Sequence, residues 1–82
     1  MPRHEVLAPI PGVFYRRPDP GSPDYVKPGQ TVTADDTVGL VEVMKSFHPV
    51  LAGVAGTVVD FAVEGESVVD PGQAVVILEV EG

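Results

Sequence analysis

The chain has two lysines, Lys27 and Lys45, and their amines could form amides with activated carboxylic acids. Such a modification needs an amine that an enzyme can reach without unfolding the protein. Lys45 lies in residues 40–49, a pattern typical of one strand, a reversal at 44–46 and the start of a second strand. Lys27 lies beside Pro28-Gly29, an ordinary solvated position for a lysine. Lys45 is therefore the candidate for modification, although a lone lysine in a turn is usually only a solubilising group.

Short strands separated by turns are the elements that must position Lys45. The 82 residues include nine glycines and nine prolines, and 44% of them are hydrophobic, which is typical of turn-rich β structure. No apolar segment has a helical period. Pro28-Gly29 and Pro71-Gly72 have the residue types that the centre of a type II turn requires. We expect strands at residues 5–8, 12–15, 31–32, 37–43, 46–50, 56–61, 67–69 and 74–80.

The chain consists of two similar halves. Residues 7–14 match residues 51–58, with Gly12 opposite Gly56, and residues 40–43 match residues 77–80. Two copies of one supersecondary unit can bury their apolar faces against each other. We therefore predict one domain over residues 1–82. Its fold would be all-β, a flattened barrel-sandwich of two four-stranded antiparallel sheets related by an internal pseudo-two-fold axis.

The first half contains an insertion that the second half lacks. The offset between matched residues falls from 44, at Leu7 and Leu51, to 36, at Gly29 and Gly65. The extra residues lie within 16–24, where several prolines and a glycine exclude a helix and a central strand. We expect this segment to be a stiff projecting loop.

Charge and composition exclude several kinds of partner and site. The formal net charge of −7 would repel the phosphate backbone of a nucleic acid. The chain has no cysteine, His4 and His48 are isolated, and no spacing indicates a metal site or a catalytic group. No apolar run is long enough to cross a bilayer, and the first residues do not form an export signal. We therefore expect a cytoplasmic protein that does not insert into membranes.

Three segments together resemble a known family. Val43-Met44-Lys45 follows an acidic residue in a strand, Gly12-Val13-Phe14-Tyr15 ends an early strand, and residues 16–24 are inserted. This combination, which extends over nearly the whole chain, resembles the biotin carboxyl carrier proteins of multisubunit bacterial and plastid acetyl-CoA carboxylases. In that family a Met directly precedes the biotinylated lysine, and the insertion, called the thumb, packs over the biotin ring. Many relatives have Ala and a second Met where this chain has Val43 and Ser46.

The resemblance implies a site, a cofactor and partners. Biotin would be attached covalently to Lys45, in a hairpin formed by Glu42, Val43, Met44, Lys45 and Ser46. The implied thumb residues are Arg17, Pro18, Asp19, Pro20, Gly21, Ser22 and Pro23. A biotin protein ligase would attach the biotin, and a biotin carboxylase subunit would carboxylate it. The chain itself would be a non-catalytic carrier that delivers the carboxyl group to a carboxyltransferase subunit, for acetyl-CoA carboxylation in fatty acid biosynthesis.

Other roles remain as alternatives. A lipoyl domain of a 2-oxo acid dehydrogenase-type complex shares the sandwich and the hairpin lysine, but an acidic residue usually precedes that lysine, whereas this chain has Met44. The thumb insertion also disfavours a lipoyl domain. A different biotin-dependent carboxylase would use the same carrier chemistry. A related sandwich that serves only as a structural or transport-adaptor module would need no lysine at the hairpin tip.

Overall fold

Eight strands make up the regular structure of residues 2–81, the part of the chain that the computed structural model describes. They are β1 (Arg3–Leu7), β2 (Gly12–Tyr15), β3 (Thr31–Val32), β4 (Thr37–Val43), β5 (Ser46–Leu51), β6 (Gly56–Phe61), β7 (Ser67–Val69) and β8 (Ala74–Glu79). Within residues 2–81 there is no helix that could cross a membrane. All eight predicted strands are confirmed. Small differences lie at the ends of β1, β5 and β8; β1 begins earlier than expected because Arg3 pairs with Glu79.

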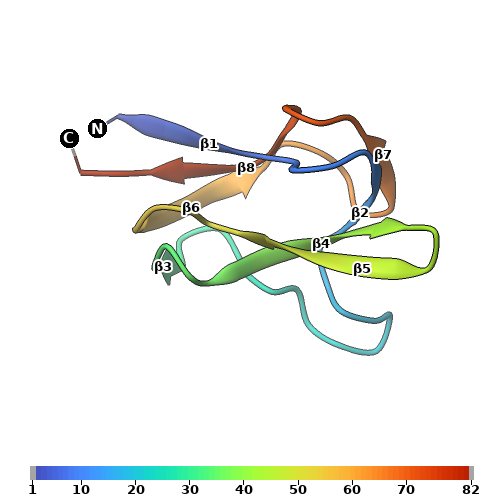
Figure 1. The fold of residues 1–82 in the computed structure, drawn as a ribbon. Helices are drawn as coiled ribbons and strands as arrows, with labels where there is room; N and C mark the ends of the chain where they lie inside the picture. The colour runs from blue at the N-terminus through green and yellow to red at the C-terminus, as the bar shows by residue number, and fades with distance from the viewer. Residues whose placement is uncertain (1, 82) are drawn as a thin grey trace.

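The strands form two antiparallel sheets that pack face to face (Figure 1). One sheet has the order β1-β8-β6-β3 and the other has the order β5-β4-β2-β7. A pseudo-two-fold axis relates the two orders, because exchanging β1 with β5, β2 with β6, β3 with β7 and β4 with β8 converts one into the other. The predicted duplication and fold class are therefore confirmed. The β4–β5 hairpin lies at one end of the molecule, and the start of β1 and the end of β8 lie at the other (Figure 1).

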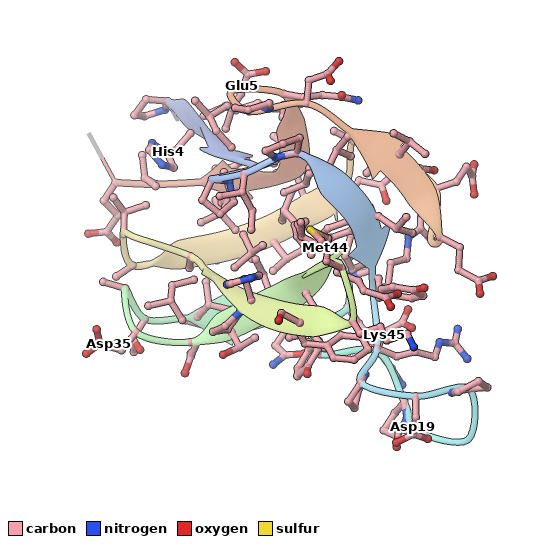
Figure 2. The ribbon with its side chains drawn as sticks, turned by 45° about the vertical axis from the view of Figure 1, so that its right-hand side comes forward. His4, Glu5, Asp19, Asp35, Met44 and Lys45 are labelled. Carbon is pink, nitrogen blue, oxygen red and sulfur yellow. The ribbon has the colours of Figure 1, made fainter. Side chains whose placement is uncertain are left out.

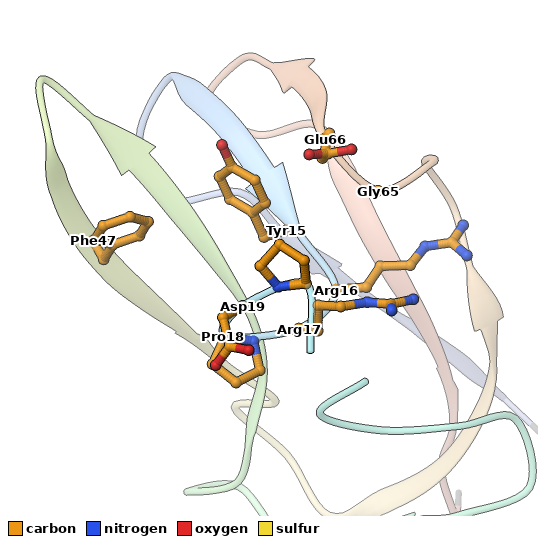
Figure 3. A pocket seen from close by; sticks show the side chains of 9 residues that line it. Tyr15, Arg16, Arg17, Pro18, Asp19, Phe47, Gly65 and Glu66 are labelled. Atoms are coloured by element: carbon orange, nitrogen blue, oxygen red, sulfur yellow. The ribbon is translucent and has the colours of Figure 1, made fainter. Parts of the chain in front are cut away.

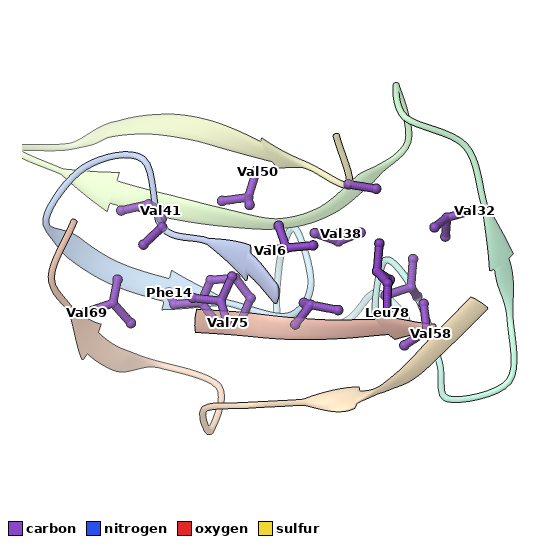
Figure 4. Close-up of a cluster of buried hydrophobic side chains, with 14 residues drawn as sticks. Val6, Phe14, Val32, Val38, Val41, Val50, Val58, Val69, Val75 and Leu78 are labelled. Atoms are coloured by element: carbon purple, nitrogen blue, oxygen red, sulfur yellow. The ribbon is translucent and has the colours of Figure 1, made fainter. Parts of the chain in front are cut away.

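Valines fill most of the core between the sheets (Figure 4). Phe14 of β2 and Leu78 of β8 are the largest of the fully buried side chains. Among the described residues no polar or charged side chain is buried. Val41, the repeat counterpart of Leu78, is also fully buried. Burial of Val38 and Val41 anchors β4, the strand that leads into the hairpin.

Both predicted type II turns are confirmed, and they occupy matching places in the two halves. Gly29 has a φ of 91° and Gly72 a φ of 84°, which a glycine adopts without a steric cost. In each turn the fourth residue donates a hydrogen bond to the carbonyl of the first, at 3.0 Å in residues 27–30 and 3.1 Å in residues 70–73. These turns fix the connections into β3 and β8.

Residues 16–24, which we call the thumb, contain no strand and no helix, and they project from the sandwich near the hairpin end (Figure 1). The N–H of Tyr25 donates a 2.8 Å hydrogen bond to the carbonyl of Arg16, so the two ends of the loop lie side by side. The assignment of this loop as the thumb of the resembled family stays a prediction. A role for it in holding a cofactor stays a prediction.

Candidate functional site

Lys45 is one of the two residues at the tip of the β4–β5 hairpin (Figure 2). Val43 pairs with Ser46, which leaves Met44 and Lys45 as a two-residue loop. The φ angles of Met44 and Lys45 are 49° and 67°, and a type I′ turn requires positive values at both positions. This turn type matches the twist of the two strands, so the ladder of pairs continues up to the loop.

The residue types in this turn are unfavourable for the fold. A residue with a Cβ in the left-handed region costs about 1–2 kcal/mol, and Asn or Gly is the usual choice in a type I′ turn. Met44 is 93% exposed and Lys45 is exposed as well, so packing does not offset this cost. Residues held in such conformations cluster at active sites, ligand clamps and switch regions. The Lys45 amine is accessible to an enzyme.

An aromatic pair covers the outer face of the sheet beside the hairpin. The hydroxyl of Tyr15 donates a 2.9 Å hydrogen bond to Oε1 of Glu42. The rings of Tyr15 and Phe47 lie 6.3 Å apart, centroid to centroid, and Phe47 pairs with Glu42 across β4 and β5. The hydrogen bond to Glu42 raises the pKa of Tyr15 above its ordinary value, and burial and the charges of Glu42 and Glu66 add to the effect. Tyr15 is therefore a protonated donor at neutral pH.

A pocket of about 720 Å³ lies between this aromatic pair and the thumb. Figure 3 shows Phe47 and Glu66 on opposite sides of Tyr15, with Pro18 and Asp19 below. The volume of the pocket is in the range of small-molecule sites, roughly 300–1,000 Å³. The lining residues are Tyr15, Arg16, Arg17, Pro18, Asp19, Pro20, Phe47, Gly65 and Glu66.

Contacts within the thumb hold its shape. Oδ1 of Asp19 accepts a 3.0 Å hydrogen bond from the Gly21 N–H, and Oδ2 accepts one of 2.9 Å from the Ser22 hydroxyl. Nη2 of Arg17 lies 3.1 Å from Oδ1 of Asp24, near the other end of the loop. The thumb is therefore a structured wall of the pocket. Among residues 2–81 no group of three or more His, Asp or Glu side chains could hold a metal ion.

Only part of the predicted site gathers around this pocket. Of the predicted thumb residues, Arg17, Pro18, Asp19 and Pro20 line it, whereas Gly21, Ser22 and Pro23 do not. The hairpin residues Glu42, Val43, Met44, Lys45 and Ser46 do not line it either, although the next residue, Phe47, does. Val43 instead packs against the core.

Sequence reasoning did not identify the other pocket residues. Tyr15 belongs to the Gly12–Tyr15 signature but not to the predicted site, and the predicted site does not include Phe47. Both carried a usable signal, because aromatic residues make up only 6% of the chain. Gly65 and Glu66 carried none, since their position opposite the thumb depends on how β7 pairs with β2.

Comparison with known proteins identifies the family of this chain. A family model described as "Biotin-requiring enzyme" matches residues 4–78. The chain belongs to this family. The chain is also similar to the biotin carboxyl carrier protein of acetyl-CoA carboxylase from Chlamydia muridarum. It is 47% identical over 53 residues, which are 65% of this chain and 32% of that protein.

The protein of the same name from Porphyra purpurea is 32% identical over 74 residues, 90% of this chain and 47% of that protein. This chain therefore spans less than half the length of these two relatives. A solved single-chain, multi-domain long-chain acyl-CoA carboxylase contains the same fold, with a TM-score of 0.77 and 19% identity. The match covers 98% of this chain and 7% of that one.

Proposed function

We propose that residues 1–82 are a biotin carboxyl carrier domain, with biotin joined as an amide to Nζ of Lys45. The observation that carries the proposal is the exposed Lys45 in a strained two-residue turn at the hairpin tip. The similar proteins from Chlamydia muridarum and Porphyra purpurea are biotin carboxyl carrier proteins by name, which supports biotin. Met44 directly before Lys45 supports biotin over lipoate, because a lipoyl lysine usually follows an acidic residue.

The chemistry of the pocket fits the bicyclic ring of biotin. Tyr15 and Phe47 offer aromatic surface to its apolar part. The ureido group has two N–H donors and one carbonyl acceptor. The carboxylates of Asp19 and Glu66 could accept from the N–H groups, and the guanidinium of Arg17 could donate to the carbonyl. Because Phe47 is only two residues from Lys45, an arm on Lys45 would begin beside this pocket.

Biotin, when attached, supplies a ureido nitrogen that can accept and release a carboxyl group. The residues of this chain hold and present the arm. The buried side chain of Val41 anchors β4 in the core, and the Val43–Ser46 pair extends the β4–β5 pairing up to the tip. Lys45 therefore keeps a fixed place at one end of the sandwich. A tethered arm reaches its enzymes at a high effective concentration, because it does not diffuse freely.

The partners that follow from this role are a biotin protein ligase, a biotin carboxylase and a carboxyltransferase. The names of the relatives favour acetyl-CoA as the acyl substrate. Fatty acid biosynthesis in the cytoplasm follows from that substrate as part of the proposal. The net charge of −7 would assist docking to basic surfaces on these partners. In this proposal the chain carries the carboxyl group between active sites, and the partner enzymes catalyse the formation and cleavage of its bonds.

Modification by a biotin ligase tests the proposal. Incubation of the purified chain with biotin, ATP and a biotin protein ligase should add the mass of one biotinyl group in an intact-mass spectrum. Lys45→Arg should abolish the addition. Lys27→Arg is the matched control, because it changes the only other lysine, and it should label fully.

The same assay separates the alternatives by mass. Loading by a lipoate ligase, with no loading by the biotin ligase, would overturn the proposal in favour of a lipoyl domain. Labelling that persists in Lys45→Arg and disappears in Lys27→Arg would show that Lys27 is the attachment site. Absence of labelling by either ligase would leave only a structural role for the fold.

A further inference from the structure

Arg16 connects two segments that are far apart in the sequence. It follows β2 directly, and its side chain reaches the loop between β6 and β7, residues 62–66. Nη2 of Arg16 donates a 2.8 Å hydrogen bond to the carbonyl oxygen of Val63. The guanidinium carbon lies 4.4 Å from the centroid of the Phe61 ring, a cation–π contact. Oε2 of Glu64 lies 3.8 Å from the same Nη2.

The main chain and the stem of Arg16 contact both walls of the pocket. Its carbonyl accepts the 2.8 Å hydrogen bond from Tyr25 that closes the base of the thumb. Its Cγ and Cδ lie beside Gly65, at 3.7 Å from the position that a Cβ would have there. Gly65 and Glu66 of the β6–β7 loop line the pocket, and so do thumb residues. A single residue therefore joins the thumb to the facing loop.

We propose that Arg16 is a positioning residue that holds the thumb against the β6–β7 loop and so sets the width of the pocket. The role of Arg16 in placing the thumb is proposed independently of any ligand. Only its consequence for biotin rests on the function proposed above. Arg17 has a different role, because it pairs with Asp24 inside the thumb itself.

The hydrogen bond and the ring contact account for most of this effect. The side chain of Arg16 is 29% exposed, so water screens its interactions only in part, whereas Glu64 is 89% exposed and its ion pair contributes little. A planar guanidinium can stack on Phe61 and donate to the Val63 carbonyl at once, which an ammonium group does less well. One cost remains: the buried Nε of Arg16 has no acceptor among residues 2–81.

Amide hydrogen exchange of the unmodified protein tests the proposal. Arg16→Met keeps an unbranched stem but removes the hydrogen bond, the charge and the cation–π contact. The Tyr25 amide, whose acceptor is the Arg16 main chain, should then exchange at least tenfold faster, while amides of β4 and β8 keep their rates. Arg3→Met is the matched control, because Arg3 is exposed on β1, and it should leave Tyr25 unchanged.

Two results would overturn the proposal. One is an unchanged exchange rate at Tyr25 in Arg16→Met, and the other is an equal increase at every amide, which would mean general destabilisation. If Arg16→Met does not fold, Arg16→Lys decides the question: it keeps the charge, and it should raise Tyr25 exchange by a smaller factor without affecting β4 and β8.

The biotinylated protein gives a second readout. In the unaltered chain, biotinylation should shift the NMR signals of Asp19 and Phe47, which both line the pocket. In Arg16→Met these shifts should fall by at least half, while intact mass confirms full loading. If the unaltered chain accepts no biotin, the proposed function fails, and the exchange experiment still decides the role of Arg16. Full shifts in biotinylated Arg16→Met would show that the pocket does not need Arg16.

Discussion

Tyr15 and Glu42 are 27 residues apart, and the Tyr15 hydroxyl donates a 2.9 Å hydrogen bond to the Glu42 carboxylate. The bond joins β2, where the thumb begins, to β4, where the hairpin begins. Because Tyr15 also lines the pocket and lies against Phe47, this one side chain connects the hairpin to the pocket wall.

Tyr15→Phe should lower the melting temperature at pH 7, because it removes this hydrogen bond. The pKa of Tyr15 in the folded protein is raised above the unfolded value, near 10.0. The stabilisation is therefore complete below the unfolded pKa and is lost as the pH rises through the folded pKa. The difference in melting temperature between the two proteins should stay constant from pH 7 to 9 and shrink above pH 10.

Ultraviolet titration of the tyrosines provides the control for that prediction. Subtracting the Tyr15→Phe curve from the parent curve isolates Tyr15, and Glu42→Gln should move its midpoint down toward the ordinary value, since Glu42 is the main cause of the shift. A midpoint that stays high in Glu42→Gln would assign the shift to burial instead.

Gly12→Ala should destabilise the domain by about 1–3 kcal/mol, because it overpacks a rigid contact. A Cβ on Gly12 would collide with the carbonyl oxygen of Glu42 and lie 2.9 Å from a methyl of Val43, at the base of the hairpin. Gly56, its repeat counterpart, should behave alike, since a Cβ there would lie 2.6 Å from the Glu79 carbonyl oxygen. Urea denaturation measures the change.

Gly65→Ala is the matched control for these two variants. Its Cβ would meet nothing closer than the flexible Arg16 stem at 3.7 Å, so the free energy of unfolding should hardly change. A loss in Gly65→Ala as large as that in Gly12→Ala would mean that the replacement of a glycine as such, and not crowding by the new Cβ, sets the cost.

Met44→Asn should stabilise the fold by about 0.5–1 kcal/mol, because Asn adopts the left-handed conformation more readily than Met. The substitution loses no packing, since Met44 is almost fully exposed. Met44→Ala has no polar side chain that could hydrogen-bond locally in this conformation, so it should show no gain. If Met44 serves recognition by a biotin ligase, Met44→Asn should also slow biotin loading; denaturation curves and loading rates measure the two effects separately. Equal stability of the Asn and Ala variants would contradict the strain argument.

The fold was predictable from sequence because its signals are local. Pro28-Gly29 and Pro71-Gly72 each combine a fixed φ with a residue that tolerates a positive φ, and the repeat relates the strands of the two halves. The pocket was not predictable, because its contacts are long-range: Arg16 meets Val63 across 47 positions. The type I′ turn at Met44 was hidden for another reason, since neither of its residues is the Asn or Gly that marks this turn.

Replacing residues 17–24 with two glycines should leave the sandwich folded, with a change in the free energy of unfolding below about 1 kcal/mol. None of these residues belongs to the buried core, and the Arg16 carbonyl and the Tyr25 N–H already lie 2.8 Å apart. The variant loses the Arg17–Asp24 ion pair, a partly exposed contact worth about 0–1 kcal/mol. A shorter loop has a smaller entropic cost of closure, by about 0.6 kcal/mol per halving of its length, which offsets this loss.

Thermal unfolding measures the change in stability of this variant. Biotin loading of Lys45 should remain complete, because the hairpin does not depend on the thumb. Collapse of the fold would show that the thumb is a structural element, and loss of loading alone would place it in the surface that the ligase recognises.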